Sequence, residues 1–170
     1  MSEMAIVKVK LSDLHPDPAN TRVHSQRNIE VIKSSLLEHS QYLPLVVQKS
    51  TMKILVGNGR FEAIRQLREE ARWESDEVIC NVVEIDDVKA AMLAITDNRS
   101  AELADWDKEA LAKALSSFDG FDLEQYGWND EDIAKLTETP SGDDNEGEKG
   151  DKKRQKKSVR CPSCGKEFVP

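Results

Sequence analysis

The chain has 170 residues and a formal net charge of −8, with 38% hydrophobic, 5% aromatic and 33% charged residues. This length and apolar content predict one modest hydrophobic core and exclude two full domains. No apolar run approaches the ~18 residues of a membrane helix, so we expect neither a membrane span nor a secretory signal peptide, and a cytoplasmic location.

The N-terminal part of the chain is predicted to form a strand, a loop and a helix. Residues 6–11 alternate apolar and basic side chains with period two, which is typical of a strand. Residues 13–25 contain two prolines and are predicted to form an irregular loop. Ser25 is expected to cap a helix that ends near His39.

Two strands and a glycine-rich turn are predicted next. Residues 45–48 and 53–56 are short apolar runs joined by four residues, the length of a hairpin turn. The second run leads through Gly-Asn-Gly-Arg at residues 57–60 into apolar residues at helical spacing. This segment is therefore predicted to be a strand, a tight turn and the start of a helix.

The rest of the ordered chain is predicted to add a strand and three helices. Residues 78–85 are rich in Val and Ile and predict a buried strand, and Asp86 or Asp87 is expected to cap the helix that follows. Apolar spacing over 111–118 and 133–136 predicts two more helices. The fold class is therefore α+β, with a small mixed sheet, helices over it, a helical extension and a flexible tail.

The turn at residues 57–60 is the best local candidate for a binding site. Its two glycines allow the backbone to approach a ligand, the N–H groups at a helix start attract anions, and Arg60 can contact two phosphate oxygens at once. The alternative is a tight turn whose arginine is merely solvated.

Four short motifs occur in a recognisable order. They are Asn-Thr-Arg at 20–22, Gln-Tyr-Leu-Pro-Leu-Val-Val at 41–47, Gly-Asn-Gly-Arg at 57–60 and Asp-Asn-Arg at 97–99. Together with the element order over about residues 7–136, they resemble the ParB/sulfiredoxin superfamily, and specifically its ParB-like N-terminal domain (also called the ParB-like nuclease domain). The stretch around Asp-Asn-Arg resembles the versions found beside DNA-modification enzymes of phages and mobile elements, which implies a bacterial host cell.

This resemblance implies a nucleoside triphosphate, CTP or ATP, bound with Mg²⁺. Asp97 and Asn98 would offer oxygen ligands to the metal, although they could equally cap or end their helix. Glu62 could act as a catalytic base, or could simply be a favourable acidic residue near a helix start. The implied nucleotide-binding residues are Gly57, Asn58, Gly59, Arg60, Arg22 and Arg99.

The sequence also departs from the family in ways that limit its chemistry. Asn58 stands where sulfiredoxins have their nucleophilic cysteine, so sulfiredoxin activity is not expected. The same position lacks the glutamate of partition proteins, so CTP binding is implied without hydrolysis by their route. Only about 35 residues of predicted helical extension follow Ser100, so a full helix-turn-helix module for a specific DNA site is expected to be missing.

The C-terminal tail differs from the body in charge. Residues 1–140 carry 16 Lys and Arg against 26 Asp and Glu, whereas residues 141–170 carry 8 against 6. The acidic stretch at 143–151 is followed by a basic arm at 152–157, which could contact DNA weakly through its phosphates or could simply aid solubility.

The three cysteines form no disulfide scaffold. Cys161 and Cys164 resemble one knuckle of a zinc ribbon, which supplies half of a four-ligand zinc site. A second copy of the chain in a homodimer, or another partner, would have to complete it, and the alternative is a reduced, disordered end. Cys80 is predicted to be a small buried apolar residue, and His24 a surface histidine.

We therefore expect a ParB/sulfiredoxin-like domain at 1–100, a helical extension at 101–137, a charged flexible linker at 138–158 and a zinc-knuckle-like tail at 159–170. Three functions are compatible with the sequence. The first is a nucleotide-binding ParB-like protein that binds DNA or assists a DNA-modifying protein. The second is a nucleotide-dependent triphosphatase, kinase, other phosphotransferase or nuclease of the same fold, and the third is a non-catalytic adaptor that recruits a partner through its tail.

Overall fold

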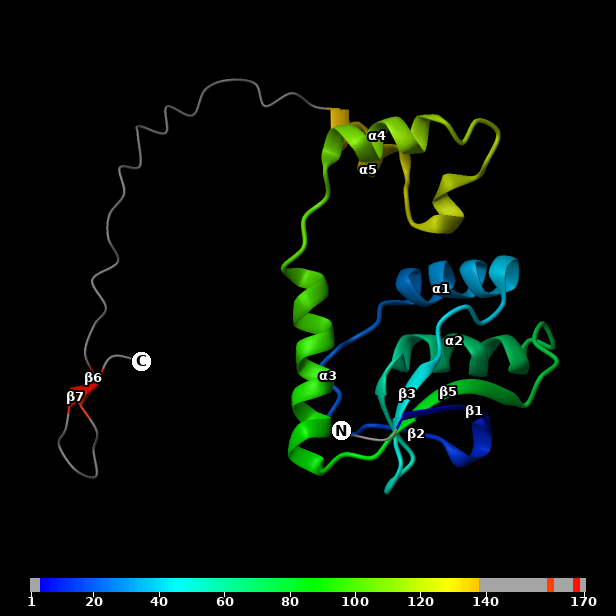
Figure 1. Cartoon of the computed structure of the whole chain (residues 1–170). Coiled ribbons are helices and arrows are strands. Elements are labelled where there is room, and N and C mark those ends of the chain that lie inside the picture. The colour runs from blue at the N-terminus through cyan, green and yellow to red at the C-terminus, as the bar shows by residue number, and fades with distance from the viewer. Residues whose placement is uncertain (1–3, 138–158, 161–166, 169–170) are drawn as a thin grey trace. The chain divides into compact units, whose positions relative to one another are not determined.

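The computed structural model describes residues 4–137, 159–160 and 167–168 (Figure 1). The chain divides into two compact units, 1–138 and 139–170, which we describe separately. In the second unit the described strands β6 (Val159–Arg160) and β7 (Glu167–Phe168) pair antiparallel. The predicted zinc ligands Cys161 and Cys164 and the basic arm lie outside the described residues.

The first unit is built on a five-stranded mixed sheet with the order β1-β5-β3-β4-β2. β1 and β5 are antiparallel, β5 and β3 parallel, β3 and β4 antiparallel, and β4 and β2 parallel. The four strands predicted from the sequence are confirmed, whereas the two-residue β2 lies in a segment predicted to be loop. The strands are β1 (Met4–Lys10), β2 (His15–Pro16), β3 (Leu45–Gln48), β4 (Lys53–Val56) and β5 (Glu77–Val83).

Two of the helices begin at cap residues that the sequence predicts. The Ser25 hydroxyl accepts a hydrogen bond from the backbone N–H of Asn28, and the Asp86 carboxylate accepts one from that of Lys89, so both predicted N-caps are confirmed. The α-helices are α1 (Gln26–His39), α2 (Asn58–Glu69), α3 (Asp87–Glu102), α4 (Lys108–Ser116) and α5 (Asp130–Thr137), and the 3-10 helices are η1 (Leu11–Asp13) and η2 (Leu123–Tyr126).

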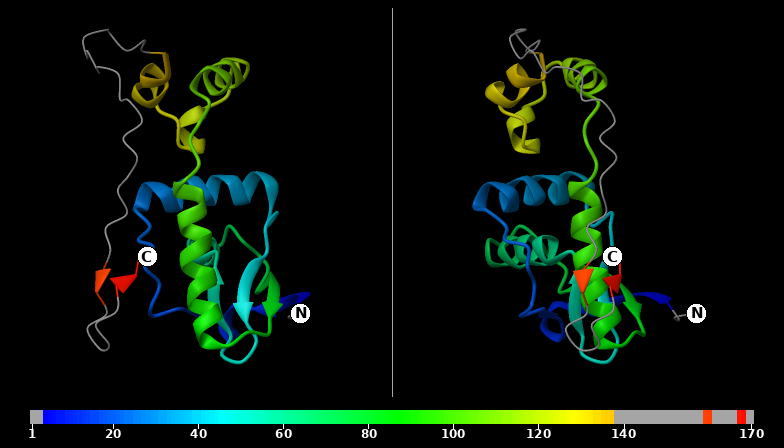
Figure 2. Two further views of the ribbon diagram at one scale, coloured as in Figure 1. Left: turned by 60° about the vertical axis from the view of Figure 1, so that its left-hand side comes forward. Right: turned by 90° about the vertical axis from the view of Figure 1, so that its left-hand side faces the viewer.

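α2 lies between α1 and the sheet, and α3 contacts β4 (Figures 1 and 2). The main core fills the space between α2 and the sheet and continues to α1. Each large apolar side chain buried there contributes about 1.5–3 kcal/mol. Its fully buried members include Leu36, Leu45, Val47, Ile54, Ile64, Leu67, Val78 and Cys80.

These contacts hold the start of α2 firmly at the end of β4. Phe61 and Ile64 anchor the first turns of α2 in the core, and Ala90 of α3 packs against Leu55 of β4 and Val83 of β5. None of the helices in the described part of the chain is long and apolar enough to cross a membrane.

Candidate functional site

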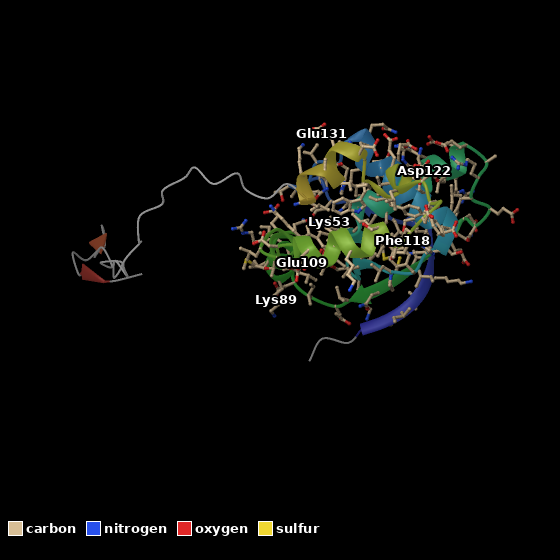
Figure 3. All side chains as sticks on the ribbon, turned by 90° about the horizontal axis from the view of Figure 1, so that it is seen from above. Lys53, Lys89, Glu109, Phe118, Asp122 and Glu131 are labelled. Atoms are coloured by element: carbon tan, nitrogen blue, oxygen red, sulfur yellow. The ribbon has the colours of Figure 1, made fainter. Side chains whose placement is uncertain are left out.

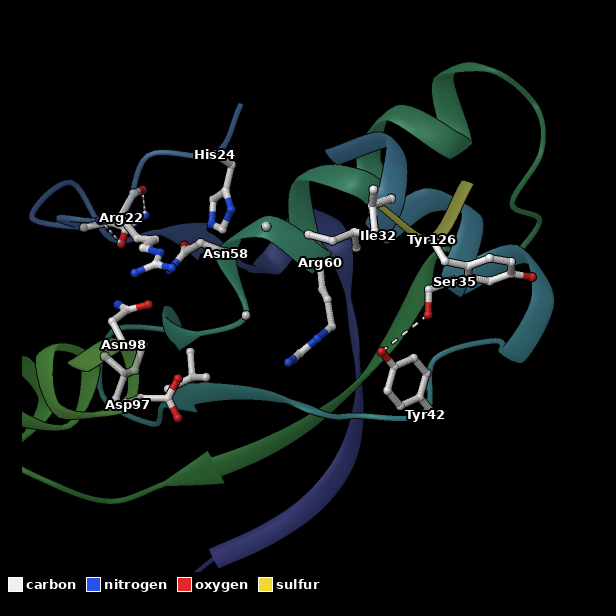
Figure 4. A pocket seen from close by; sticks show the side chains of 16 residues that line it. Arg22, His24, Ile32, Ser35, Tyr42, Asn58, Arg60, Asp97, Asn98 and Tyr126 are labelled. Atoms are coloured by element: carbon white, nitrogen blue, oxygen red, sulfur yellow. Dashed lines mark hydrogen bonds between the residues drawn. The ribbon is translucent and has the colours of Figure 1, made fainter. Parts of the chain in front are cut away.

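A hollow of about 430 Å³ opens where β4 leads into α2 (Figure 4). Its walls come from the loop before α1, one face of α1, the β4–α2 turn, α3 and η2. Of the residues predicted from the sequence, the hollow brings together Arg22, Gly57, Asn58, Gly59, Arg60, Asp97 and Asn98. We call this hollow the α2 pocket.

Gly57 shapes the turn that opens the α2 pocket. Its φ of +98° lies in the left-handed region, and a Cβ added to it would lie 2.7 Å from Cδ2 of the buried Leu45. No side chain caps α2, and its first backbone hydrogen bond runs from the N–H of Phe61 to the carbonyl of Gly57. The preceding N–H groups of the helix therefore face the pocket as anion-binding donors.

Gly59 allows a histidine to lie against the helix start. A Cβ at Gly59 would lie 2.7 Å from Cε1 of His24, whose Nδ1 lies 2.7 Å from Oδ1 of Asn28. His24 is therefore a half-buried pocket residue and not the surface histidine that we predict from the sequence. The difference arises because Ser25, the next residue, is the N-cap that fixes this loop to α1.

The two arginines of the pocket have different partners. Arg60 is half-buried. Its only hydrogen bond within the described residues is a long one, 3.5 Å from Nη1 to the carbonyl of Pro44. Arg22 donates to Glu102, which also accepts from Arg99 at 3.1 Å. Arg60 thus forms no ion pair with a carboxylate in the described part of the chain.

Asn58 places an unsatisfied acceptor in the pocket wall. Its Nδ2 donates to the carbonyl of Ile54 at 3.2 Å, while its buried Oδ1 has no hydrogen-bond donor among the residues that the structure describes. Leaving a buried acceptor unpaired costs about 1–3 kcal/mol. A ligand that brings a donor to this position would recover part of that cost.

Asp97 and Asn98 lie on the α3 side of the pocket, opposite Ser35 and Tyr42 (Figure 4). The Nδ2 of Asn98 donates to the carbonyl of Ala94 at 3.0 Å, which leaves its Oδ1 as an acceptor. Mg²⁺ is commonly held by one or two carboxylates together with substrate phosphates. The described residues contain no group of three or more metal-ligating His, Cys, Asp or Glu side chains, so this donor set fits Mg²⁺ only as part of a metal–nucleotide complex.

Two predicted residues lie outside the pocket. Glu62 accepts hydrogen bonds from Arg65 at 2.7 and 3.0 Å and from Gln66 at 2.7 Å, and the bond from Arg65 lowers the pKa of its carboxyl group. Arg99 pairs with Glu102 on α3 and does not line the pocket. Successive residues of a helix are rotated by about 100°, so Asp97 and Asn98 can share a wall that Arg99 does not reach.

The far wall of the pocket is made of residues that the sequence analysis missed. Ile32 and Ser35 lie three residues apart on one face of α1, and the Ser35 hydroxyl lies 3.4 Å from the Tyr42 hydroxyl. The helical spacing of Ile32 and Ser35 was an available signal. Tyr126 comes from η2, far along the chain, and no local pattern could have assigned it to this wall.

Part of the chain is similar in sequence to a known protein. No protein-family model matches the chain. The curated stage 0 sporulation protein J of Bacillus subtilis (strain 168) is 34% identical over 68 residues, which are 38% of this chain and 24% of that protein. The chain thus spans about a quarter of the length of the curated relative that it matches.

Two solved structures are also similar. The C-terminally truncated chromosome-partitioning protein ParB from Caulobacter crescentus, complexed with CTP-gamma-S, aligns with a TM-score of 0.56 and 20% identity, covering 78% of this chain and 70% of that chain. The Pnob8-like ParB-N domain aligns with a TM-score of 0.47 and 26% identity, covering 66% of this chain and 44% of that chain. The chain has the fold of the ParB N-terminal domain.

Proposed function

We propose that the chain binds a nucleoside triphosphate, CTP or ATP with Mg²⁺, in the α2 pocket. The observation that carries this proposal is Arg60, a half-buried guanidinium without a carboxylate partner in the described residues, beside a helix N-terminus that no side chain caps. A phosphate group would satisfy both, because guanidinium and backbone N–H groups are strong donors to phosphate oxygens. The bound CTP analogue of the Caulobacter crescentus ParB structure gives independent support for this ligand class.

Each part of the pocket has a task in this proposal. The N–H groups at the start of α2 and Arg60 would hold the phosphates. Gly57 forms the left-handed turn before these groups, and Gly59 makes room for the His24 ring beside them. Asp97 and Asn98 would hold the Mg²⁺ of the metal–nucleotide complex, which offsets phosphate charge. Arg22, fixed to Glu102, would contact an outer phosphate oxygen.

We further propose that this nucleotide-bound domain works on DNA, or beside a DNA-modifying protein, in a phage or mobile element. The body of the chain is acidic, with 26 Asp and Glu against 16 Lys and Arg in residues 1–140, so bulk charge does not favour DNA there. The basic arm at 152–157 would supply a weak contact with DNA phosphates, whose affinity falls as salt rises.

The proposal is tested by thermal shift and calorimetry with CTP, ATP, GTP and UTP, each with Mg²⁺. A ligand at 100 times its Kd stabilises the folded state by about 2.7 kcal/mol, which corresponds to a rise in Tm of several degrees. The rise should be lost in Arg60→Ala and kept in Arg68→Ala, which removes an exposed arginine of the same helix outside the pocket. No rise with any nucleotide, or an equal rise in both variants, would refute it.

A further inference from the structure

A second hollow, of about 380 Å³, lies between the end of α1, the end of α4 and η2, apart from the β4–α2 turn. Its lining is mostly apolar and rich in aromatic rings. Phe118 and Phe121 are 49% and 65% exposed and pack edge to face with their centroids 6.2 Å apart. We call this hollow the aromatic groove; it is lined by Glu38, His39, Leu115, Phe118, Phe121, Leu123, Tyr126 and Trp128.

An acidic hollow of about 480 Å³ adjoins the aromatic groove, and the two share Phe121, Leu123 and Trp128. Its other walls carry four carboxylates, those of Asp122, Glu124, Asp130 and Glu131. Glu131 pairs with Lys135, whereas no basic side chain in the described residues forms an ion pair with the other three. This surface therefore combines exposed aromatic rings with uncompensated negative charge.

The charge of the whole segment reinforces this pattern. Residues 105–137 carry nine Asp or Glu against three Lys. Seen from above, Glu109, Phe118, Asp122 and Glu131 all belong to the face formed by α4, η2 and α5 (Figure 3). Aromatic side chains this exposed are costly to leave in water and commonly mark a binding surface.

We propose that the aromatic groove is a docking surface for a basic amphipathic helix of a partner protein. Apolar side chains of the helix enter the groove beside the Phe118–Phe121 pair, and Lys or Arg side chains on its flank meet Asp122 and Glu124. An apolar face in a groove with basic residues beside it is a common mode of helix recognition. Charge complementarity selects this occupant, because an acidic or neutral helix would leave the carboxylates of the adjoining hollow unpaired.

The occupant is a helix and not a small molecule because the apolar surface continues outside the hollow. Trp106 is 70% exposed and packs edge to face on Trp128, with centroids 6.0 Å apart. A small ligand inside the groove would leave the Trp106 ring in water, whereas a helix would extend over it. The aromatic groove shares Tyr126 with the α2 pocket, and its proposed occupant is separate from the nucleotide proposed there.

The test uses the full chain and a fluorescein-labelled helical peptide of about 15 residues, made of Leu on one face and Lys on the other. Its affinity is measured by fluorescence anisotropy. Phe121→Ala, which removes a ring of the groove, and Glu124→Lys, which reverses a charge on its flank, should each weaken binding at least tenfold. Met92→Ala and Glu74→Lys, matched changes at exposed residues outside both hollows, should change the affinity by less than about twofold.

Three outcomes would overturn the proposal. The first is equal binding by all four variants with unchanged circular dichroism spectra. The second is equally tight binding of a peptide in which Glu replaces Lys. The third is self-association of the wild-type chain that Phe121→Ala abolishes in sedimentation experiments, because the groove would then be occupied by a second copy.

Discussion

Replacing Gly57 with alanine should cost much of the stability of the domain. The backbone of residue 57 has a φ of +98°, in the left-handed region, and holding an alanine in this conformation costs about 1–2 kcal/mol. The same Cβ would lie 2.7 Å from Cδ2 of Leu45, which is fully buried, and overpacking of this kind costs about 1–3 kcal/mol. The lower chain entropy of the unfolded alanine variant returns about 0.4–1 kcal/mol. We therefore expect a net loss of about 1–5 kcal/mol in the free energy of unfolding.

Two other glycines separate the backbone cost from the steric cost. Gly120 has a φ of +81° with no atom within 4 Å of the added Cβ, and Gly127 has a φ of +90° with Cγ2 of Val31 at 3.3 Å. Urea unfolding of the three alanine variants should therefore give the smallest loss at Gly120, an intermediate loss at Gly127 and the largest at Gly57. In a Leu45→Ala background the loss at Gly57 should shrink, because the clashing methyl group is gone. A loss at Gly57 no larger than that at Gly120 would refute the steric reasoning.

Two further predictions concern titratable groups, the first the exposed partner of a buried lysine and the second a buried thiol. Nζ of the buried Lys33 lies 2.6 Å from Oε1 of Glu70, and this hydrogen bond lowers the pKa of the Glu70 carboxyl group. The stabilisation is therefore present above the ordinary glutamate pKa of about 4.3 and is lost as the pH falls through the lowered value. In urea unfolding, the advantage of wild type over Glu70→Gln should be constant from neutral pH to about pH 5.5 and shrink below about pH 4.5; a difference independent of pH would contradict the pairing. Burial raises the pKa of the Cys80 thiol to about 11, so in a Cys161→Ser, Cys164→Ser chain Ellman's reagent at about pH 8 should react with Cys80 only after denaturation. Fast reaction in the folded chain would show that Cys80 is not buried.

The predictable part of the fold was the part set by local chemistry. Ser25 and Asp86 cap their helices with their own side chains, and the apolar alternation of residues 6–11 marks a strand, so the sequence alone places these elements. β2 escaped prediction because His15 and Pro16 form a strand only by pairing with Lys53 and Ile54, far along the chain. A two-residue strand has no periodicity of its own to detect.

In the candidate site, too, the residues set by local sequence could be predicted, whereas those brought together by the fold could not. The glycines and Arg60 follow one another in the chain, so their chemistry is visible as a motif, and Arg22, Asp97 and Asn98 were named from the family resemblance. Tyr126 reaches the pocket only because η2 packs against α1. Arg99 was expected in the pocket but pairs with Glu102 and does not line it, because the side of α3 on which a residue lies depends on helix rotation that a motif does not specify.

The α2 pocket is less acidic than the chain around it. Residues 1–140 have a net charge of −10, whereas the described pocket wall has two arginines, Arg22 and Arg60, and one carboxylate, that of Asp97. Glu102 pairs with Arg22, and Arg60 at the start of α2 forms no ion pair with Asp97 or any other carboxylate in the described residues. A long polyanion such as DNA would meet the acidic body along much of its length, whereas a triphosphate is short enough to contact the pocket alone. We therefore expect the pocket to select a compact polyphosphate over a nucleic-acid backbone.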